Sequence, residues 1–97
     1  NMKKNSSHQN HEALNKTLFD ASKHVNVGST YRHYKYPKRK YKVVMLAIQE
    51  DSQQVGVIYQ DVARTDAPPF VRNLDSWLES VERDGETVPR FTCIDES

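Results

Sequence analysis

A run of six apolar residues at positions 43–48 constrains the fold more than any other feature of this 97-residue chain. It is far shorter than the roughly 20 residues of a membrane-spanning helix. It is apolar at odd and even positions alike, which is typical of a strand covered on both faces. We therefore predict that residues 41–49 form the central strand of a sheet.

Segments rich in aromatic and β-branched residues flank this run. Residues 30–36 and 55–62 have the composition of strands. Pro37 is expected to end the first of them, and residues 38–40 and 50–54 to form the connecting turns. The simplest arrangement is a three-stranded antiparallel meander, and Phe70 with Val71 predicts a further short strand.

The last third of the chain contains the clearest turn signal. Asp84-Gly85 is a preferred pair for a two-residue type I′ turn, and it predicts a hairpin between residues 80–83 and 86–94. Pro89 lies within the second strand and marks an edge or a bulge.

A short helical turn is expected just before this hairpin. Asn73 is a candidate N-cap for it, with Leu74, Trp77 and Leu78 directed inward. The predicted fold is therefore mainly β. It is either a small, partly open SH3-like barrel or a curled antiparallel sheet of about five strands, with an N-terminal helix and this helical turn.

The N-terminal part differs in composition from the rest. Residues 1–10 are polar and predict a disordered arm, and Asn1 ahead of Met2 is interpreted as a tag remnant. Apolar residues then recur at helical spacing, which predicts a helix over residues 11–25 with Asn10 as its N-cap, ahead of a β domain at residues 28–95. The apolar face of this helix comprises Leu14, Leu18 and Phe19. We expect that face to dock on the domain, on a protein partner or on a second copy in a homodimer.

Cysteine content and charge bear on the environment of the chain. Cys93 is the single cysteine, so no intramolecular disulfide is expected, and it is interpreted as a small buried hydrophobe. With neither a signal peptide nor a membrane-spanning segment expected, the predicted location is the cytoplasm. Net charge is +8 over residues 1–48 and −7 over residues 49–97. The first half either binds anions or is neutralised by the second, within the domain or across a dimer interface.

Two motifs at opposite ends of the β domain resemble a small bacterial family known as domain of unknown function 1653. One is the Tyr-Arg-His-Tyr-Lys sequence at residues 31–35, and the other is Val-Pro-Arg-Phe at residues 88–91. Between them, Val71-Arg72 and Asp84-Gly85 also fit the family pattern, and the resemblance extends over residues 28–94. The family implies the domain type and carries no established activity, cofactor or partner.

Two departures from that family pattern change the number of basic residues. Residues 36–40 (YPKRK) fill a turn that contains glycine in the family, which makes this region more basic. Gln60 stands where the family has an arginine. Of the two arginines that the family has at positions 60 and 72, this chain therefore keeps only Arg72.

Residues 31–42 are the first candidate site, because they interleave cations with tyrosines. Cations contact phosphates, and tyrosine rings stack on bases in modules that bind RNA or single-stranded DNA. Alternation places Tyr31, His33 and Lys35 on one face of the strand and Arg32, Tyr34 and Tyr36 on the other. The alternative is core tyrosines beside a solvated rim of charge. The candidate residues are Arg32, His33, Tyr34, Lys35, Lys38, Arg39, Lys40 and Lys42.

A second candidate site comprises His33, Arg72 and Arg90. Guanidinium groups suit phosphate and carboxylate, so these residues are expected to line a small anion pocket. The alternative is that the arginines pair with carboxylates such as Glu79 or Glu82 and fix the hairpin.

Motifs for catalysis are not found in the sequence. There is no glycine-rich phosphate loop, nucleophile elbow or paired-carboxylate motif. His8 and His11 are too few ligands for a closed metal site, and no cofactor is expected. The sequence favours a non-catalytic binding module, with RNA or single-stranded DNA as its ligand. The alternatives are a protein-interaction or homo-oligomerisation domain and, less favoured, a small-ligand sensor or enzyme.

Overall fold

Seven strands and two short helices make up residues 10–95, the part of the chain that the computed structural model describes. Residues 1–9 of the predicted arm at residues 1–10 lie outside the described residues. The elements are α1 (His11–Ala21), β1 (Thr30–His33), β2 (Tyr36–Ile48), β3 (Val55–Asp61), β4 (Phe70–Asn73), α2 (Leu74–Trp77), β5 (Ser80–Arg83), β6 (Glu86–Pro89) and β7 (Phe91–Cys93).

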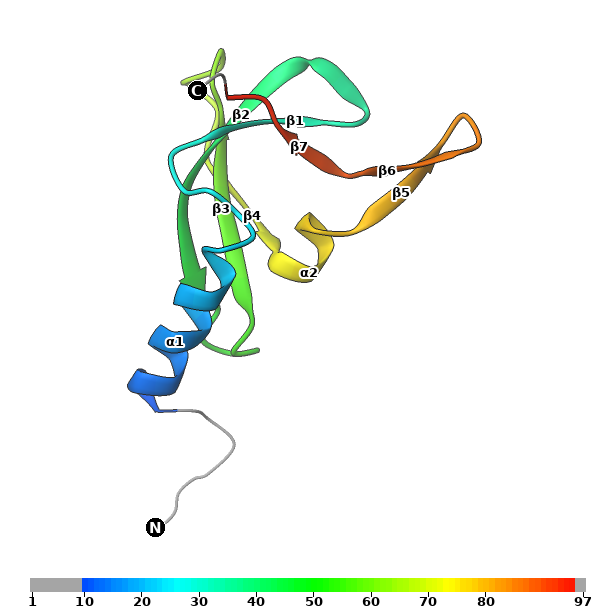
Figure 1. The fold of residues 1–97 in the computed structure, drawn as a ribbon. Coiled ribbons are helices and arrows are strands. Elements are labelled where there is room, and N and C mark those ends of the chain that lie inside the picture. Colours follow the sequence, from blue (N-terminus) through cyan, green and yellow to red (C-terminus); the bar gives the residue numbers. More distant parts are fainter. Residues whose placement is uncertain (1–9, 96–97) are drawn as a thin grey trace.

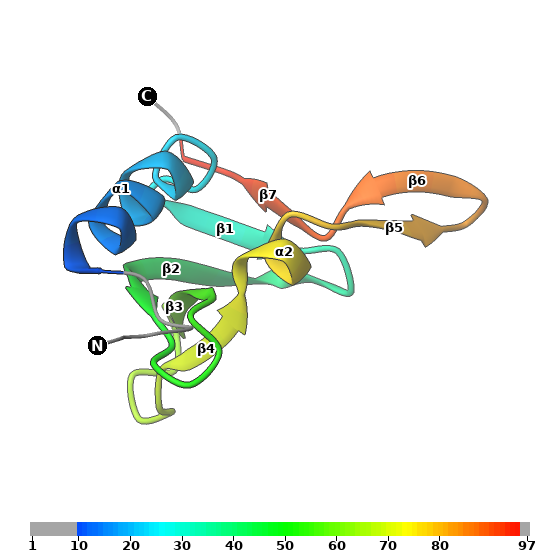
Figure 2. The ribbon, with the colours of Figure 1, turned by 90° about the horizontal axis from the view of Figure 1, so that it is seen from below.

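Five of the strands form one antiparallel sheet in the order β4-β3-β2-β1-β7, and β5 pairs only with β6. The long strand β2 is central, as predicted. Figure 2 shows the sheet curving around α2, which lies between the two edge strands β4 and β7. Since these edges do not pair with each other, the sheet is curled and is not a closed barrel.

The core lies on the inner face of the curled sheet. Trp77 of α2 is buried there, as predicted, with its ring stacked on that of Phe91 at a centroid distance of 3.6 Å. Leu78 was expected to point inward as well, but it is exposed. The buried cluster consists of Val25, Tyr31, Tyr41, Val43, Val57, Trp77 and Phe91.

The outer face of β2 is less covered than its sequence predicts. Val43 is fully buried, whereas Val44 and Met45 are about half exposed. A register irregularity falls between Val43 and Met45 in the pairing with β3. The prediction that both faces of this strand are covered was therefore wrong, although its central place in the sheet is confirmed.

Helix α1 lies against β2 and β3 (Figure 1). The Asn10 side chain accepts a hydrogen bond from the Ala13 N–H, which confirms the predicted N-cap. The helix ends at Ala21 rather than at residue 25, since residues 22–25 form a turn. Leu14 and Leu18 are partly buried, but Phe19 is 63% exposed and does not dock on this domain.

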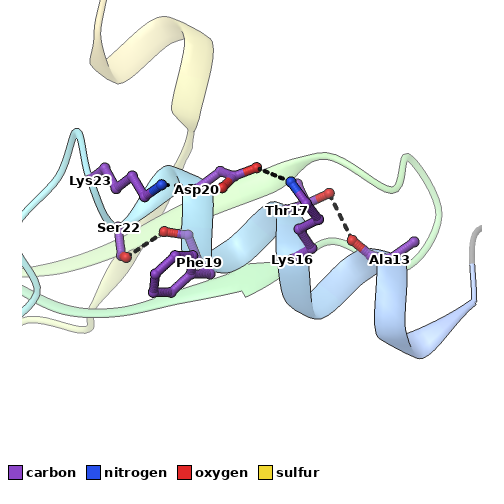
Figure 3. A network of polar contacts seen from close by, with 7 residues as sticks. All are labelled: Ala13, Lys16, Thr17, Phe19, Asp20, Ser22 and Lys23. Carbon is purple, nitrogen blue, oxygen red and sulfur yellow. Dashed lines mark hydrogen bonds and ion pairs between the residues drawn. The ribbon is translucent and has the colours of Figure 1, made fainter.

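The exposed side of α1 carries a small polar network, shown in Figure 3. Asp20 pairs with Lys16 at 3.2 Å and with Lys23 at 3.8 Å. The Lys23 ammonium also lies 5.0 Å from the centre of the Phe19 ring. These are surface contacts, each of which contributes little to stability.

The first hairpin differs most from the sequence prediction. His33 pairs with Tyr36, so the chain turns at Tyr34 and Lys35, and β2 begins before Pro37. The next pair along these strands is Tyr31 with Tyr41. Between the two pairs, β1 has one residue and β2 has four. Pro37 and the predicted turn at residues 38–40 therefore bulge from the sheet, and we call residues 37–40 the basic bulge.

The second hairpin has the predicted turn, but its second strand ends at Pro89 and does not continue to residue 94, because residues 91–93 form β7 and pair with β1. Asp84 and Gly85 have φ values of 52° and 82°, as a type I′ turn requires. The ribbon of β5 and β6 extends away from the sheet in Figure 1. The Arg83 guanidinium donates a hydrogen bond to the Tyr34 carbonyl oxygen, which ties the ribbon to the first hairpin.

The C-terminal strand β7 pairs with β1 at the edge of the sheet. Phe91 points into the core, while Cys93 is exposed, so the interpretation of that cysteine as a buried hydrophobe was wrong. Neither helix within residues 10–95 is long and apolar enough to cross a bilayer.

Candidate functional site

The turn of the first hairpin is held by hydrogen bonds from both of its residues. The Lys35 N–H donates to Nδ1 of His33 at 3.1 Å. The Tyr34 N–H donates to the Arg90 carbonyl oxygen at 3.0 Å. Strand β1 and the junction between β6 and β7 thus fix this turn together.

This turn gathers three rings that strict alternation would have separated. His33 is 7% exposed, and its ring centre lies 4.9 Å from that of Tyr34 and 5.4 Å from that of Tyr36. Its other neighbour is Phe91, whose ring lies edge-on at 4.9 Å. The predicted division of His33 from Tyr34 and Tyr36 was wrong, because the chain reverses between them. These aromatic rings therefore form a row that extends from the core to Tyr36 at the surface, which is 44% exposed.

Cations surround the outer end of this row of rings. The Arg39 guanidinium lies 4.7 Å from the centre of the Tyr36 ring, and the Lys35 ammonium lies 6.0 Å from that of Tyr34. Such cation–π contacts hold charge beside an aromatic face. The exposed cations on this hairpin are Arg32, Lys35, Lys38, Arg39, Lys40 and Lys42.

None of these six cations forms an ion pair with a carboxylate in residues 10–95. The ion pairs of that region are on α1, within Arg83-Asp84 and between Arg90 and Glu79. The proposed neutralisation of the basic half by neighbouring strands is therefore not seen on this hairpin. Its surface is left with a local excess of positive charge.

The two arginines of the second candidate site meet at Ser76 in α2. Nη1 of Arg72 donates to Oγ of Ser76 at 2.9 Å, and Nε of Arg90 donates to the Ser76 carbonyl oxygen at 3.0 Å. Arg72 also lies over the Phe91 ring, 5.5 Å from its centre. We call Arg72 and Arg90 the arginine pair.

The two members of the arginine pair differ in their ionic partners. Nη2 of Arg90 contacts Oε1 of Glu79 at 2.6 Å, as the sequence allowed. Arg72 has no carboxylate partner in the described chain, and its Nε is buried without a hydrogen bond there. The alternative in which both arginines pair with carboxylates thus holds for Arg90 alone.

The charge of this cluster acts on His33. Burial is the main reason that the pKa of His33 lies below its ordinary value, and the positive charges of Arg72, Arg90 and Lys35 lower it further. The imidazole is therefore neutral at pH 7. Since its Nδ1 accepts the Lys35 N–H, the proton is on Nε2, which is a donor.

The predicted site residues thus fall into two neighbouring groups and one distant one. The hairpin carries the tyrosines and most cations, and His33 joins it to the arginine pair. Leu14, Leu18 and Phe19 lie on α1, away from both groups. The sequence analysis missed the roles of Ser76 and Phe91, although Phe91 belongs to the Val-Pro-Arg-Phe motif. In residues 10–95 there is no cluster of side chains suited to hold a metal ion.

Comparison with known proteins identifies the domain type. Residues 29–93 match the model of a family described as "Protein of unknown function (DUF1653)". The chain belongs to the DUF1653 family. A crystal structure of a DUF1653 protein from Bordetella bronchiseptica is similar, with a TM-score of 0.63 and 29% identity over 76% of this chain and 94% of that one. No curated protein matches the chain. The DUF1653 assignment confirms the resemblance noted from the two end motifs.

Proposed function

We propose that this DUF1653 domain is a non-catalytic module that binds RNA or single-stranded DNA on the hairpin of β1 and β2. The observation that carries the proposal is the exposed Tyr36 ring with Arg39 beside it, set among cations that have no carboxylate partner within residues 10–95. Modules that hold single strands combine these two elements, an aromatic surface for bases and cations for the backbone.

The shape of the hairpin supports this proposal. The basic bulge projects Lys38, Arg39 and Lys40 from the sheet next to the turn that presents Tyr34 and Tyr36. The turn is pinned to the rest of the domain through His33 and Arg90, so the rings do not have to be ordered when a ligand binds. The hairpin exposes only a small number of aromatic rings. This suits a short contact that tolerates different nucleotide sequences, and not the recognition of specific bases.

The test is a fluorescence-anisotropy titration of labelled single-stranded RNA and DNA at low and physiological salt. The main variant carries Gln in place of Lys38, Arg39 and Lys40. A matched control carries Gln in place of Lys16, Lys23 and Arg64, which are exposed cations outside the hairpin and give the same change in net charge.

We expect the wild type and the control to bind with a steep salt dependence, and the bulge variant to bind weakly. Each lost phosphate contact lowers the slope of log K against log salt by about 0.7, so three lost contacts lower it by about 2. Tyr36→Ala should weaken binding by about 1–3 kcal/mol, while Tyr36→Phe retains it, since the ring provides the stacking. An equal loss in both triple variants, or no binding at low salt, would refute the proposal.

A further inference from the structure

The surroundings of the arginine pair hold more hydrogen-bond donors than acceptors. Ser76 accepts one bond from each arginine, and Glu79 accepts one more from Arg90. Nε of Arg72 is buried and has no acceptor in the described chain. Buried polar atoms in folded proteins are nearly always paired, so this donor leaves a hydrogen bond that an added acceptor would satisfy.

Positive charge is also in excess at this place. Arg72, Arg90 and Lys35 all act on His33, and Glu79 is the one carboxylate that pairs with any of these three cations in residues 10–95. The side chain of Arg90 is only 19% exposed, whereas that of Glu79 is 59% exposed. Glu79 can therefore move into solvent and release Arg90, while the arginine stays in position on Ser76.

We propose that Arg72 and Arg90, which lie beside His33, form a binding site for a terminal phosphate group, with Glu79 occupying Arg90 when the site is free. Arginine guanidinium groups suit phosphate oxygens. The two guanidinium groups come from β4 and from the junction between β6 and β7. A phosphate monoester has three terminal oxygens that can accept from two guanidinium groups, whereas a planar carboxylate offers only two oxygens.

This phosphate site does not depend on the proposed function of the hairpin. A phosphate group could belong to inorganic phosphate or a small phosphomonoester, or to the end of a strand that also contacts the hairpin. The Tyr34 N–H bonds to the Arg90 carbonyl oxygen, so the two surfaces are neighbours. Both sources offer the same chemistry, and the experiment separates them.

The experiment is an NMR titration of the full chain with inorganic phosphate at pH 7, following the imidazole C–H resonances of His33. Sodium chloride at equal ionic strength is the reference. We expect saturable shifts with phosphate that chloride does not produce. Binding should weaken about tenfold or more in Arg72→Gln, since a hydrogen bond to a charged group is lost.

Glu79→Gln provides a second variant that does not disturb the buried arginine. Removing the competing carboxylate should tighten phosphate binding several-fold, whereas Glu82→Gln, on the exposed side of β5, should leave it unchanged. Identical shifts with phosphate and chloride, or equal affinities in the wild type and Glu79→Gln, would overturn the proposal.

The source of the phosphate is resolved by two oligonucleotides of one sequence, with and without a 5′-phosphate. Tighter binding of the phosphorylated strand in the wild type, and not in Arg72→Gln, would assign the site to a strand end. Equal affinity of the two strands, together with saturable binding of inorganic phosphate, would assign it to a free phosphate compound. If neither strand binds but phosphate does, the hairpin proposal fails and the phosphate site stands.

Discussion

Replacing Phe91 by alanine should lower the stability of the domain, because it removes a buried ring that several other rings of the core contact. Its ring stacks on Trp77, meets His33 edge-on and lies 5.8 Å from Tyr59. It belongs to β7, a three-residue strand that pairs only with β1, so backbone pairing alone holds this segment weakly.

The expected loss is large for a domain of this size. Truncation of a buried aromatic residue to alanine costs about 3–5 kcal/mol. At about 0.05–0.15 kcal/mol per residue, residues 10–95 have a total stability of about 4–13 kcal/mol. Phe91→Ala should therefore remove about a quarter or more of the free energy of unfolding. Phe91→Leu keeps apolar volume but loses the ring pairs, and should cost about 1–2 kcal/mol.

Equilibrium unfolding in urea, followed by Trp77 fluorescence and by far-UV circular dichroism, measures these losses. Phe19→Ala is the control, since this exposed ring should change stability by less than about 0.5 kcal/mol. If Phe91→Ala lowered the free energy of unfolding by less than about 1 kcal/mol, the ring cluster would not be the closing contact of the core.

Two further predictions concern the second hairpin and the buried histidine. Gly85→Ala should cost about 1 kcal/mol, because its φ of 82° disfavours a side chain although a Cβ would meet no atom within 4 Å. In Gly85→Ala, amide hydrogen exchange should become faster in β5 and β6 than in the five-stranded sheet. An equal increase in both would show that the ribbon does not open independently of the sheet. For His33, a pKa held low in the fold means that the unfolded chain binds the proton more tightly. The neutral His33 therefore contributes its full stability to the fold above its unfolded pKa of about 6.5, and this contribution is lost as the pH falls through the folded pKa. Urea midpoints should drop more steeply toward pH 5 in the wild type than in His33→Gln. Parallel curves for the two proteins would contradict this.

Elements whose signals are local were predictable from the sequence. The Asp84-Gly85 pair is such a case, because the left-handed conformation of a type I′ turn depends on these two residues themselves. The central strand was equally clear from its apolar run. Asn73 shows the limit of a local signal: it precedes α2 as predicted, but its side chain forms no capping bond and accepts a hydrogen bond from Gln49.

Elements set by distant contacts could not be predicted in this way. The turn at Tyr34 and Lys35 consists of residues that suit strands, and it is fixed by bonds to Arg83 and Arg90, some 50 residues away. Pro37 and the cations after it looked like a turn, whereas they bulge from a strand that continues on both sides.

The candidate site divides in the same way. Cations interleaved with tyrosines were visible in the sequence, and they lie on one hairpin. The meeting of Arg72 and Arg90 at Ser76 depends on how α2 lies between the edge strands, which no spacing along the chain reveals.

The free ribbon of β5 and β6 also bears on how this domain can be extended. Apart from its link to Tyr34, its strands pair with each other and not with the sheet. Exposed turns of this kind tolerate added sequence, because a longer loop costs little entropy and displaces no core residue. The tip at Asp84 and Gly85 is accordingly the place where a fluorescent label, an affinity peptide or a whole inserted domain can be carried without disturbing the rest of the fold.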